Sequence, residues 1–236
     1  MMQGVGWKLI AETFLGIAAG IVLTVPVHEI GHFLGGLMTG YRFSSIGILG
    51  LYLCKDDGGF KIKKRKDAPI GQCIMYPDSP KRTPVMLVAG GILANLAVGA
   101  LLIRIGVCAD DLDKTALLLS AGGIMAALGM LNAIPFSRTN DASTFREIVC
   151  FEGAGKLYNR LMCVYTELEN GKMPAGLSSG NLKLGVDIGK GRVRIDSGHF
   201  LGCTIAEELL YYRRLKETEL TGESGAIPRE ESVYDF

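Results

Sequence analysis

The sequence predicts a membrane α-helical fold with three spans, a β-hairpin loop between the first two spans and a small α+β region after the third. Two observations carry this prediction. Of the 236 residues, 48% are apolar and the mean hydropathy is positive, which is high for a soluble chain of this length. The apolar residues also gather into three long segments before about residue 136, whereas the remainder is mixed and charged.

Each apolar segment is long enough for one span, because a helix needs about 20 residues to cross about 30 Å of hydrocarbon. The first segment is apolar from Leu9 to Val27 except for Glu12 and a few small polar residues, and it keeps a helical pattern to Gly40, which predicts a span over residues 9–40. The other two spans are expected over residues 84–105 and 115–135. Both are rich in glycine and alanine, as expected where membrane helices approach one another closely.

Loop charges predict the orientation, because Lys and Arg accumulate on the cytoplasmic side of short connections. The loop between spans two and three is acidic, with Asp110, Asp111 and Asp113 beside a single Lys114. The loop between spans one and two is instead basic, with Arg42, Lys55, Lys61, Lys63, Lys64, Arg65, Lys66, Lys81 and Arg82. We therefore expect an N-terminus outside and a cytoplasmic C-terminus. The first segment is too long for a signal-peptide core, so it should remain in the mature protein.

Residues 41–83 are expected to contain a β-hairpin. Two strand-like segments, Ser45–Cys54 and Phe60–Lys63, flank Asp57-Gly58, and an Asp-Gly pair favours a tight turn between strands. With this hairpin loop included, the membrane core is predicted to occupy residues 1–142.

Residues 143–220 are expected to form a cytosolic domain that begins with an amphipathic helix. Thr144-x-x-Glu147 resembles a capping box, and helical spacing of apolar residues continues to Asn170-Gly171, which should end the helix. A last helix is expected from Thr204 to about Lys216.

A second hairpin is expected between these two helices, because apolar residues there alternate strictly. The alternating residues are Leu182, Leu184, Val186 and Ile188, followed after Gly189-Lys190-Gly191 by Val193 and Ile195. Residues 221–236 are acidic and contain proline, so they are expected to be disordered.

Composition narrows the range of functions. The formal net charge is +1, so nothing global indicates nucleic-acid binding. The cysteines form no C-x-x-C pair and several fall in predicted helices, which indicates reduced thiols. His199 stands alone between the hairpin and the last helix and is interpreted as structural.

His28-Glu29-Ile30-Gly31-His32 is an H-E-x-x-H motif at the far end of the first span. Residues i and i+4 share one face of a helix, so both imidazoles can reach a single cation. Glu29 follows the first ligand directly and is placed to take a proton from a water whose pKa the metal lowers. The alternative is that these are ordinary polar residues at a helix end, but such residues at membrane depth are costly and by default mark function.

A catalytic zinc takes a third protein ligand and keeps a fourth position for water. Spans one and three run parallel, so the segment after Asn132 should emerge near the two histidines, which favours Asp141. Geometry leaves open the other acidic residues on that side: Asp56, Asp57, Asp67, Asp78 and Glu147. Zinc is the metal expected from these ligand types, although iron or cobalt can occupy the same groups.

These residues resemble the site-2 protease family of intramembrane zinc metalloproteases. That family pairs H-E-x-x-H with a later N-x-x-P segment that leads to an Asp-Gly, whose aspartate is the third zinc ligand. Here the later segment is LNAIPFSRTNDAS, in which Asn132 and Pro135 match and Asp141 stands at the ligand position. Ala68–Met75 also resembles the short P-x-G-G-like strand of the family, and Ala89–Asn95 resembles its small-residue middle helix.

Three positions depart from the family pattern. Ala142 replaces the glycine after the ligand, Gln72 replaces the second glycine of the strand, and the segment between Pro135 and Asp141 lacks the usual extra prolines. No PDZ-like or CBS-like insertion is present, which is typical of a compact prokaryotic member in the plasma membrane.

The resemblance implies zinc-dependent cleavage of a membrane-embedded peptide or protein, with Glu29 as general base and His28, His32 and Asp141 as zinc ligands. It also implies that the strands of residues 41–83 dip into the bilayer, where an exposed edge could pair with unwound substrate. A plain cytoplasmic hairpin is the alternative.

Asn132, Pro135 and Asn95 are candidates for binding substrate or supporting the zinc ligands, and helix–helix adhesion is the alternative for both asparagines. The tail could bind a regulatory partner.

Two further functions use the same residues. A non-catalytic scaffold would keep the fold and the metal and only bind membrane segments, but a structural site needs no base such as Glu29. A metal transporter would use the three ligands as a transit site, but the cluster lies on one side and the outer half lacks acidic residues.

Overall fold

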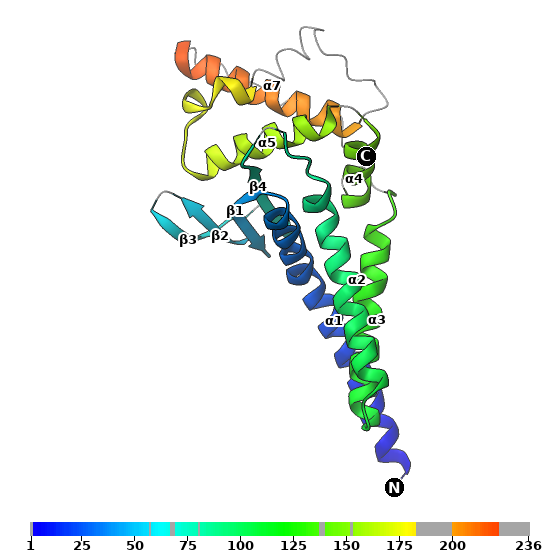
Figure 1. Ribbon diagram of the computed structural model, residues 1–236. Helices are drawn as coiled ribbons and strands as arrows, with labels where there is room; N and C mark the ends of the chain where they lie inside the picture. Colours follow the sequence, from blue (N-terminus) through cyan, green and yellow to red (C-terminus); the bar gives the residue numbers. More distant parts are fainter. Residues whose placement is uncertain are drawn as a thin grey trace.

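The computed structural model describes residues 2–56, 58–66, 69–79, 81–136, 140–151, 153–182 and 200–221. This part of the chain is mostly helical, with three long helices and one small antiparallel sheet (Figure 1). The sheet and the C-terminal helices gather at one end of the three-helix bundle, and the N-terminus lies at the other (Figure 1).

The three expected spans are present as helices α1 (Met2–Met38), α2 (Val85–Val107) and α3 (Leu112–Asn132). Each is long and apolar enough to cross a membrane. Their outer faces carry exposed large apolar side chains, among them Phe14, Val22 and Leu101. Hydrocarbon is the solvent in which such faces are stable, so the structure supports a membrane location.

Glycines bring the backbones of the three helices together. A Cβ on Gly90 of α2 would lie 2.8 Å from the carbonyl carbon of Gly31 and 3.2 Å from Cα of His32, both on α1. A Cβ on Gly20 of α1 would lie 2.7 Å from the carbonyl oxygen of Ala121 on α3. Small residues at these crossings therefore allow the close packing on which membrane helices depend.

The loop between α1 and α2 forms a four-stranded sheet rather than the expected single hairpin. Its strands are β1 (Tyr41–Ile48), β2 (Leu51–Asp56), β3 (Gly59–Lys64) and β4 (Gly71–Pro77), paired in the order β3-β2-β1-β4. The expected hairpin around Asp57-Gly58 is the β2–β3 pair, in which Asp56 faces Gly59; Asp57 lies outside the described residues. Of the strand expected over Ala68–Met75, Gly71–Met75 lie in β4, and Ala68 lies outside the described residues.

The single strand expected over Ser45–Cys54 was wrong, because the chain turns back at Leu49-Gly50. Ile48 pairs with Leu51, so only two residues form the turn, and both have positive φ, 50° for Leu49 and 79° for Gly50. Two positive φ values are typical of the turn that matches the twist of a tight hairpin. Leucine is unusual there, which is why the pattern gave no turn signal.

The C-terminal helices are α4 (Asp141–Cys150), α5 (Ala154–Glu169), the short 3-10 helix η1 (Pro174–Gly176) and α7 (Phe200–Thr221). They enclose an apolar core with β4, whose buried members include Ile74, Leu157, Leu161, Val164, Leu177, Ile205 and Leu209. The single helix expected from Thr144 onward is split in two by Gly153, which has φ +95°. Its cap is Asn140 rather than Thr144, because the Asn140 side chain accepts from the Ser143 backbone N–H.

The second hairpin was expected to begin at Leu182, but Leu182 lies in a helical turn in which its N–H donates to the Ser178 carbonyl. Its side chain is buried in the core between α5 and α7, so burial rather than alternation accounts for its apolar character. The rest of that hairpin, His199 and the tail from residue 222 lie outside the described residues. The last helix is present and is longer than expected.

A buried carboxylate joins the sheet to α5. Glu169 is 5% exposed and forms an ion pair with Arg65, while Lys63 donates to its backbone carbonyl over 2.7 Å. The Arg65 guanidinium also lies over the ring of Tyr52, 4.6 Å from its centroid. Glu169 therefore anchors the outer strands of the sheet to the C-terminal helices.

Replacing Gly90 with alanine is expected to lower the free energy of unfolding by about 1–3 kcal/mol, because the new methyl group must displace the α1 backbone. Gly123→Ala on α3 is the matched control, since nothing lies within 4 Å of a Cβ there. Thermal unfolding in detergent measures both, and equal stability of the two variants would contradict backbone contact between α1 and α2.

Replacing Glu169 with glutamine keeps the size of the side chain and removes its charge. It should lower the free energy of unfolding by about 1–2 kcal/mol, because Lys63 and Arg65 both lose a charged partner. Glu217→Gln removes an exposed i,i+4 pair with Arg213 and should cost less than about 0.5 kcal/mol. The same unfolding assay compares them, and equal losses would show that the sheet does not depend on Glu169.

Candidate metal centre

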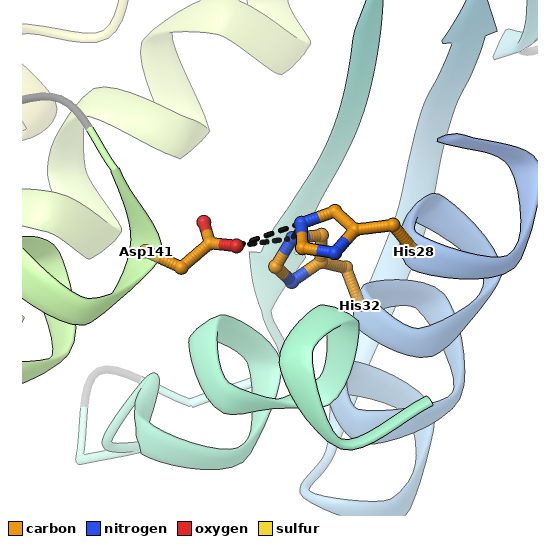
Figure 2. A group of neighbouring side chains, drawn as sticks. All are labelled: His28, His32 and Asp141. Atoms are coloured by element: carbon orange, nitrogen blue, oxygen red, sulfur yellow. Dashed lines mark hydrogen bonds and ion pairs between the residues drawn. The ribbon is translucent and has the colours of Figure 1, made fainter. Parts of the chain in front are cut away.

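Two imidazoles and one carboxylate meet near the C-terminal end of α1. His28 and His32 extend from successive turns of α1, and Asp141 reaches them from the first position of α4 (Figure 2). His28 Nε2 lies 2.7 Å and His32 Nε2 3.4 Å from Asp141 Oδ2, and the two nitrogens are 3.0 Å apart. The three side chains therefore form a group that could hold a metal ion.

Asp141 is held in place by two asparagines. Asn132, at the end of α3, donates from Nδ2 to Asp141 Oδ2 over 2.8 Å. Asn140 caps α4 and donates to the carbonyl of Ile134 over 2.6 Å, which ties the start of α4 to the end of α3. These bonds bring a residue from the C-terminal region to histidines more than a hundred positions away in the sequence.

The open alternatives for the third ligand are largely resolved by this geometry. Among the described side chains, only Asp141 is grouped with the two imidazoles. Asp78 instead pairs with Arg82 over 2.8 Å. Glu147 is buried on α4 outside the group. Asp57 and Asp67, and the side chain of Asp56, lie outside what the structure describes.

Helix α2 holds the opposite edge of each imidazole. His32 Nδ1 lies 2.7 Å from the carbonyl oxygen of Leu87 and donates to it, and Nε2 of the same ring faces Asp141. Asn95 contacts His28 Nδ1 at 3.3 Å through its amide, and its Oδ1 is buried without a partner in the described structure. With the Asn95 amide turned by about 180°, Oδ1 would face the ring and accept a hydrogen bond from His28 Nδ1–H.

Glu29 lies beside the ligand group rather than in it. Its side chain is 6% exposed, and Oε2 has no hydrogen-bond partner among the described residues. A Cβ on Gly71 of β4 would collide with Glu29 Oε1, so a side chain at this position would displace the carboxylate. A buried carboxylate oxygen left without a partner is costly, and a bound water would satisfy it.

One cavity of ≈ 340 Å³ joins Glu29 to the ligand group. Its walls come from α1, β4, α2, α4 and α5 together with the asparagines at the start of α4 and the end of α3. The lining residues are His28, Glu29, His32, Gly71, Gln72, Cys73, Leu87, Val88, Asn132, Asn140, Asp141, Thr144 and Tyr158. The C-terminal region therefore contributes directly to the site.

The donor set and the space fit a metal ion. Two nitrogens and one carboxylate oxygen suit divalent transition metals and leave a position for water. Gly91 of α2 provides the room, because a Cβ there would lie 2.5 Å from His28 Cε1 and 2.6 Å from Nε2 of both histidines. Any side chain at Gly91 would push the imidazoles apart.

The Asp141 carboxylate is charged in this environment. Burial by itself raises the pKa of Asp141, but hydrogen bonds from His28 and His32, together with their charges, outweigh burial and hold the pKa well below its usual range. A charged carboxylate is the form that binds a cation.

The structure brings two of the three candidate supporting residues to the metal centre. Asn132 and Asn95 both contact His28, whereas Pro135 is exposed after the end of α3 and does not line the cavity. Gly91 was expected only as part of the small-residue segment Ala89–Asn95, and Tyr158 belongs to no motif, so neither was predicted as a site residue. Asn140 could have been found as a helix cap directly before Asp141.

Alanine at Asn132 is expected to weaken metal binding about 10- to 100-fold, because Asp141 loses the donor that orients it. Asn170→Ala, at the exposed end of α5, should bind as wild type. Competition with a chelator in detergent measures both affinities, and His28→Ala supplies the value for a broken site. An unchanged affinity in Asn132→Ala would exclude the proposed support of Asp141.

Comparison with family models, with curated proteins and with solved structures found no match to this chain. The assignment of the site therefore rests on its residues and their geometry.

Proposed function

We propose that this chain is a zinc metalloprotease that cleaves peptide bonds within the membrane. One observation carries the proposal: a buried carboxylate, Glu29, has an unpartnered oxygen in the same cavity as a His-His-Asp ligand group. A purely structural metal site has no need for a free base beside it. The order of the motifs supports a compact member of the site-2 protease family.

Zinc is the proposed metal, with His28 Nε2, His32 Nε2 and one Asp141 oxygen as its ligands. Bound there, zinc would supply a Lewis acid and lower the pKa of water toward neutrality. The carbonyl of Leu87 and the Asn95 amide orient the imidazoles, as partners of the outer nitrogen do in metal sites.

Glu29 moves the proton in the proposed reaction. As the water oxygen bonds to the peptide carbonyl carbon, Glu29 takes a water proton and the carbonyl π electrons move onto the carbonyl oxygen. When that oxygen reforms its double bond, the C–N bond breaks and Glu29 returns the proton to the leaving nitrogen. One water is consumed, and a carboxylic acid and an amine are released.

The free edge of β4 is the proposed binding place for substrate. Backbone carbonyls in a membrane helix are hydrogen-bonded within the helix, so the segment must unwind before attack. β4 is an end strand of the sheet, and Gly71, Gln72 and Cys73 of β4 line the cavity. An unwound segment could add to this edge and regain its backbone hydrogen bonds.

The proposed orientation places this cavity toward the cytoplasm. The basic loop that predicts a cytoplasmic side forms the sheet, and the sheet lies at the same end of the bundle as the metal centre (Figure 1). Leu51, Leu53, Phe60 and Ile62 on the outer strands are exposed apolar residues, which supports contact of the sheet with the bilayer.

Glu29→Gln is expected to lower the rate of peptide cleavage about 10²- to 10⁴-fold and to keep the metal, because the amide cannot take a proton. Glu12→Gln is the matched control, since Glu12 belongs to the same helix but does not line the cavity. Purified proteins in detergent are incubated with a panel of single-span membrane peptides, and bound zinc is counted in each.

Cleavage by wild type and Glu12→Gln, with zinc but no cleavage in Glu29→Gln, supports the proposed function. Zinc in all three proteins with no cleavage of any peptide would favour a binding scaffold. A wild-type protein that binds no metal would contradict the metal centre itself.

A further inference from the structure

Tyr158 brings a hydroxyl into the cavity from outside the motif-bearing core. It belongs to α5 and lines the cavity together with Glu29 and Asp141. Its hydroxyl forms no hydrogen bond with any described residue, although Tyr41, Tyr52 and Tyr165 each donate from their hydroxyls to a side-chain oxygen. The hydroxyl is therefore free to donate a hydrogen bond to a molecule bound in the cavity.

The ring of Tyr158 is held firmly by its surroundings. It packs against the apolar core that contains Ile74 of β4. It also packs against a second buried cluster, formed by Tyr41, Met75 and Leu87. The next residue, Asn159, accepts from the Tyr41 hydroxyl over 2.8 Å and donates to the Arg82 carbonyl over 2.8 Å. These buried bonds tie α5 to β1 and to the segment before α2, so the position of the hydroxyl is set before substrate arrives.

The hydroxyl remains a donor at physiological pH. Burial raises the pKa of Tyr158, and the negative charges of Asp141 and Glu29 raise it further.

Peptide hydrolysis needs a donor of this kind. When water adds to the carbonyl carbon, the carbonyl oxygen becomes negative, and donors fixed in advance around it are a major source of rate enhancement. Asn132 is already committed to Asp141, and the histidines are metal ligands. Asn140 lines the cavity as well, but its amide donates to the Ile134 carbonyl. Thr144, one turn from Asp141 on α4, and Gln72, on the β4 edge proposed to pair with substrate, are the rival side-chain donors, and the Cys73 thiol is a weak one.

We propose that the Tyr158 hydroxyl donates a hydrogen bond to the peptide carbonyl oxygen as that oxygen becomes negative. This inference rests on the proposed function and makes Tyr158 a catalytic residue. The bond strengthens as charge moves from the carbonyl π bond onto oxygen, and it weakens again when the double bond reforms and the amine leaves. Tyr158 keeps its proton throughout, and Glu29 carries the transferred proton.

Through Tyr158, the C-terminal helix α5 would take part in peptide hydrolysis. α5 packs on β4, and its Tyr158 lines the cavity together with residues of α1. Displacement of α5 would therefore remove a catalytic group without touching the metal ligands.

Tyr158→Phe is expected to keep its zinc and its KM and to lose about 10²- to 10³-fold in kcat, because only the bond to the developing charge is lost. Tyr41→Phe is the matched control: it removes a buried hydroxyl bonded to the neighbouring Asn159, so it should lower stability and leave kcat within twofold. Thr144→Val and Gln72→Leu test the two rival donors.

A binding measurement decides the role without catalysis. A phosphinic peptide presents a tetrahedral, negatively charged oxygen, whereas a mercapto peptide of the same sequence presents only a thiolate to the metal. Tyr158→Phe should weaken the phosphinic peptide at least tenfold and leave the mercapto peptide unchanged, with bound zinc counted in each sample.

The outcomes separate this inference from the proposed function. If wild type binds the phosphinic peptide but cleaves no substrate, the proposed function fails, and the selective loss in Tyr158→Phe still supports the oxyanion contact. An equal loss for both peptides, an unchanged kcat, or a larger effect in Thr144→Val or Gln72→Leu would overturn the assignment to Tyr158. A wild-type protein that binds neither peptide overturns both.

Discussion

The contact between Asp141 and the two imidazoles of α1 links regions that are far apart in the sequence. It joins the end of the first long helix to the start of the C-terminal helices, and it requires α3 to end where Asn132 and Asn140 can hold α4. Such a cluster of charged and polar groups is stable near hydrocarbon only if each member has a partner. The surrounding asparagines and carbonyls supply those partners.

Close helix packing makes this contact possible. Gly31 and Gly90 let α1 and α2 touch through their backbones, and Gly91 then leaves space for the imidazoles. The same approach brings the Leu87 carbonyl and Asn95 to the outer edges of the two rings. Adjacent glycines of α2 therefore serve two purposes: Gly90 lets the helices pack closely, and Gly91 leaves room for the metal ligands.

The sheet and the C-terminal helices complete the cavity from the other side. β4 contributes Gly71 against Glu29, and α5 contributes Tyr158. Glu169 and Asn159, both on α5, tie this helix to Arg65 after β3 and to Tyr41 of β1. The region after Asp141, whose sequence carries no recognisable motif, therefore forms a wall of the site rather than a separate appendage.

The sequence by itself determined the features that depend on neighbours along the chain. Apolar runs of sufficient length predicted the three long helices, and i,i+4 spacing placed His28 and His32 on one face. The turn at Leu49-Gly50, the break at Gly153, the contact of Asn95 with His28 and the place of Tyr158 in the cavity wall depend on contacts between distant residues and emerge only from the folded structure. Local periodicity reports which face of an element is apolar, but only packing decides which distant side chain meets it.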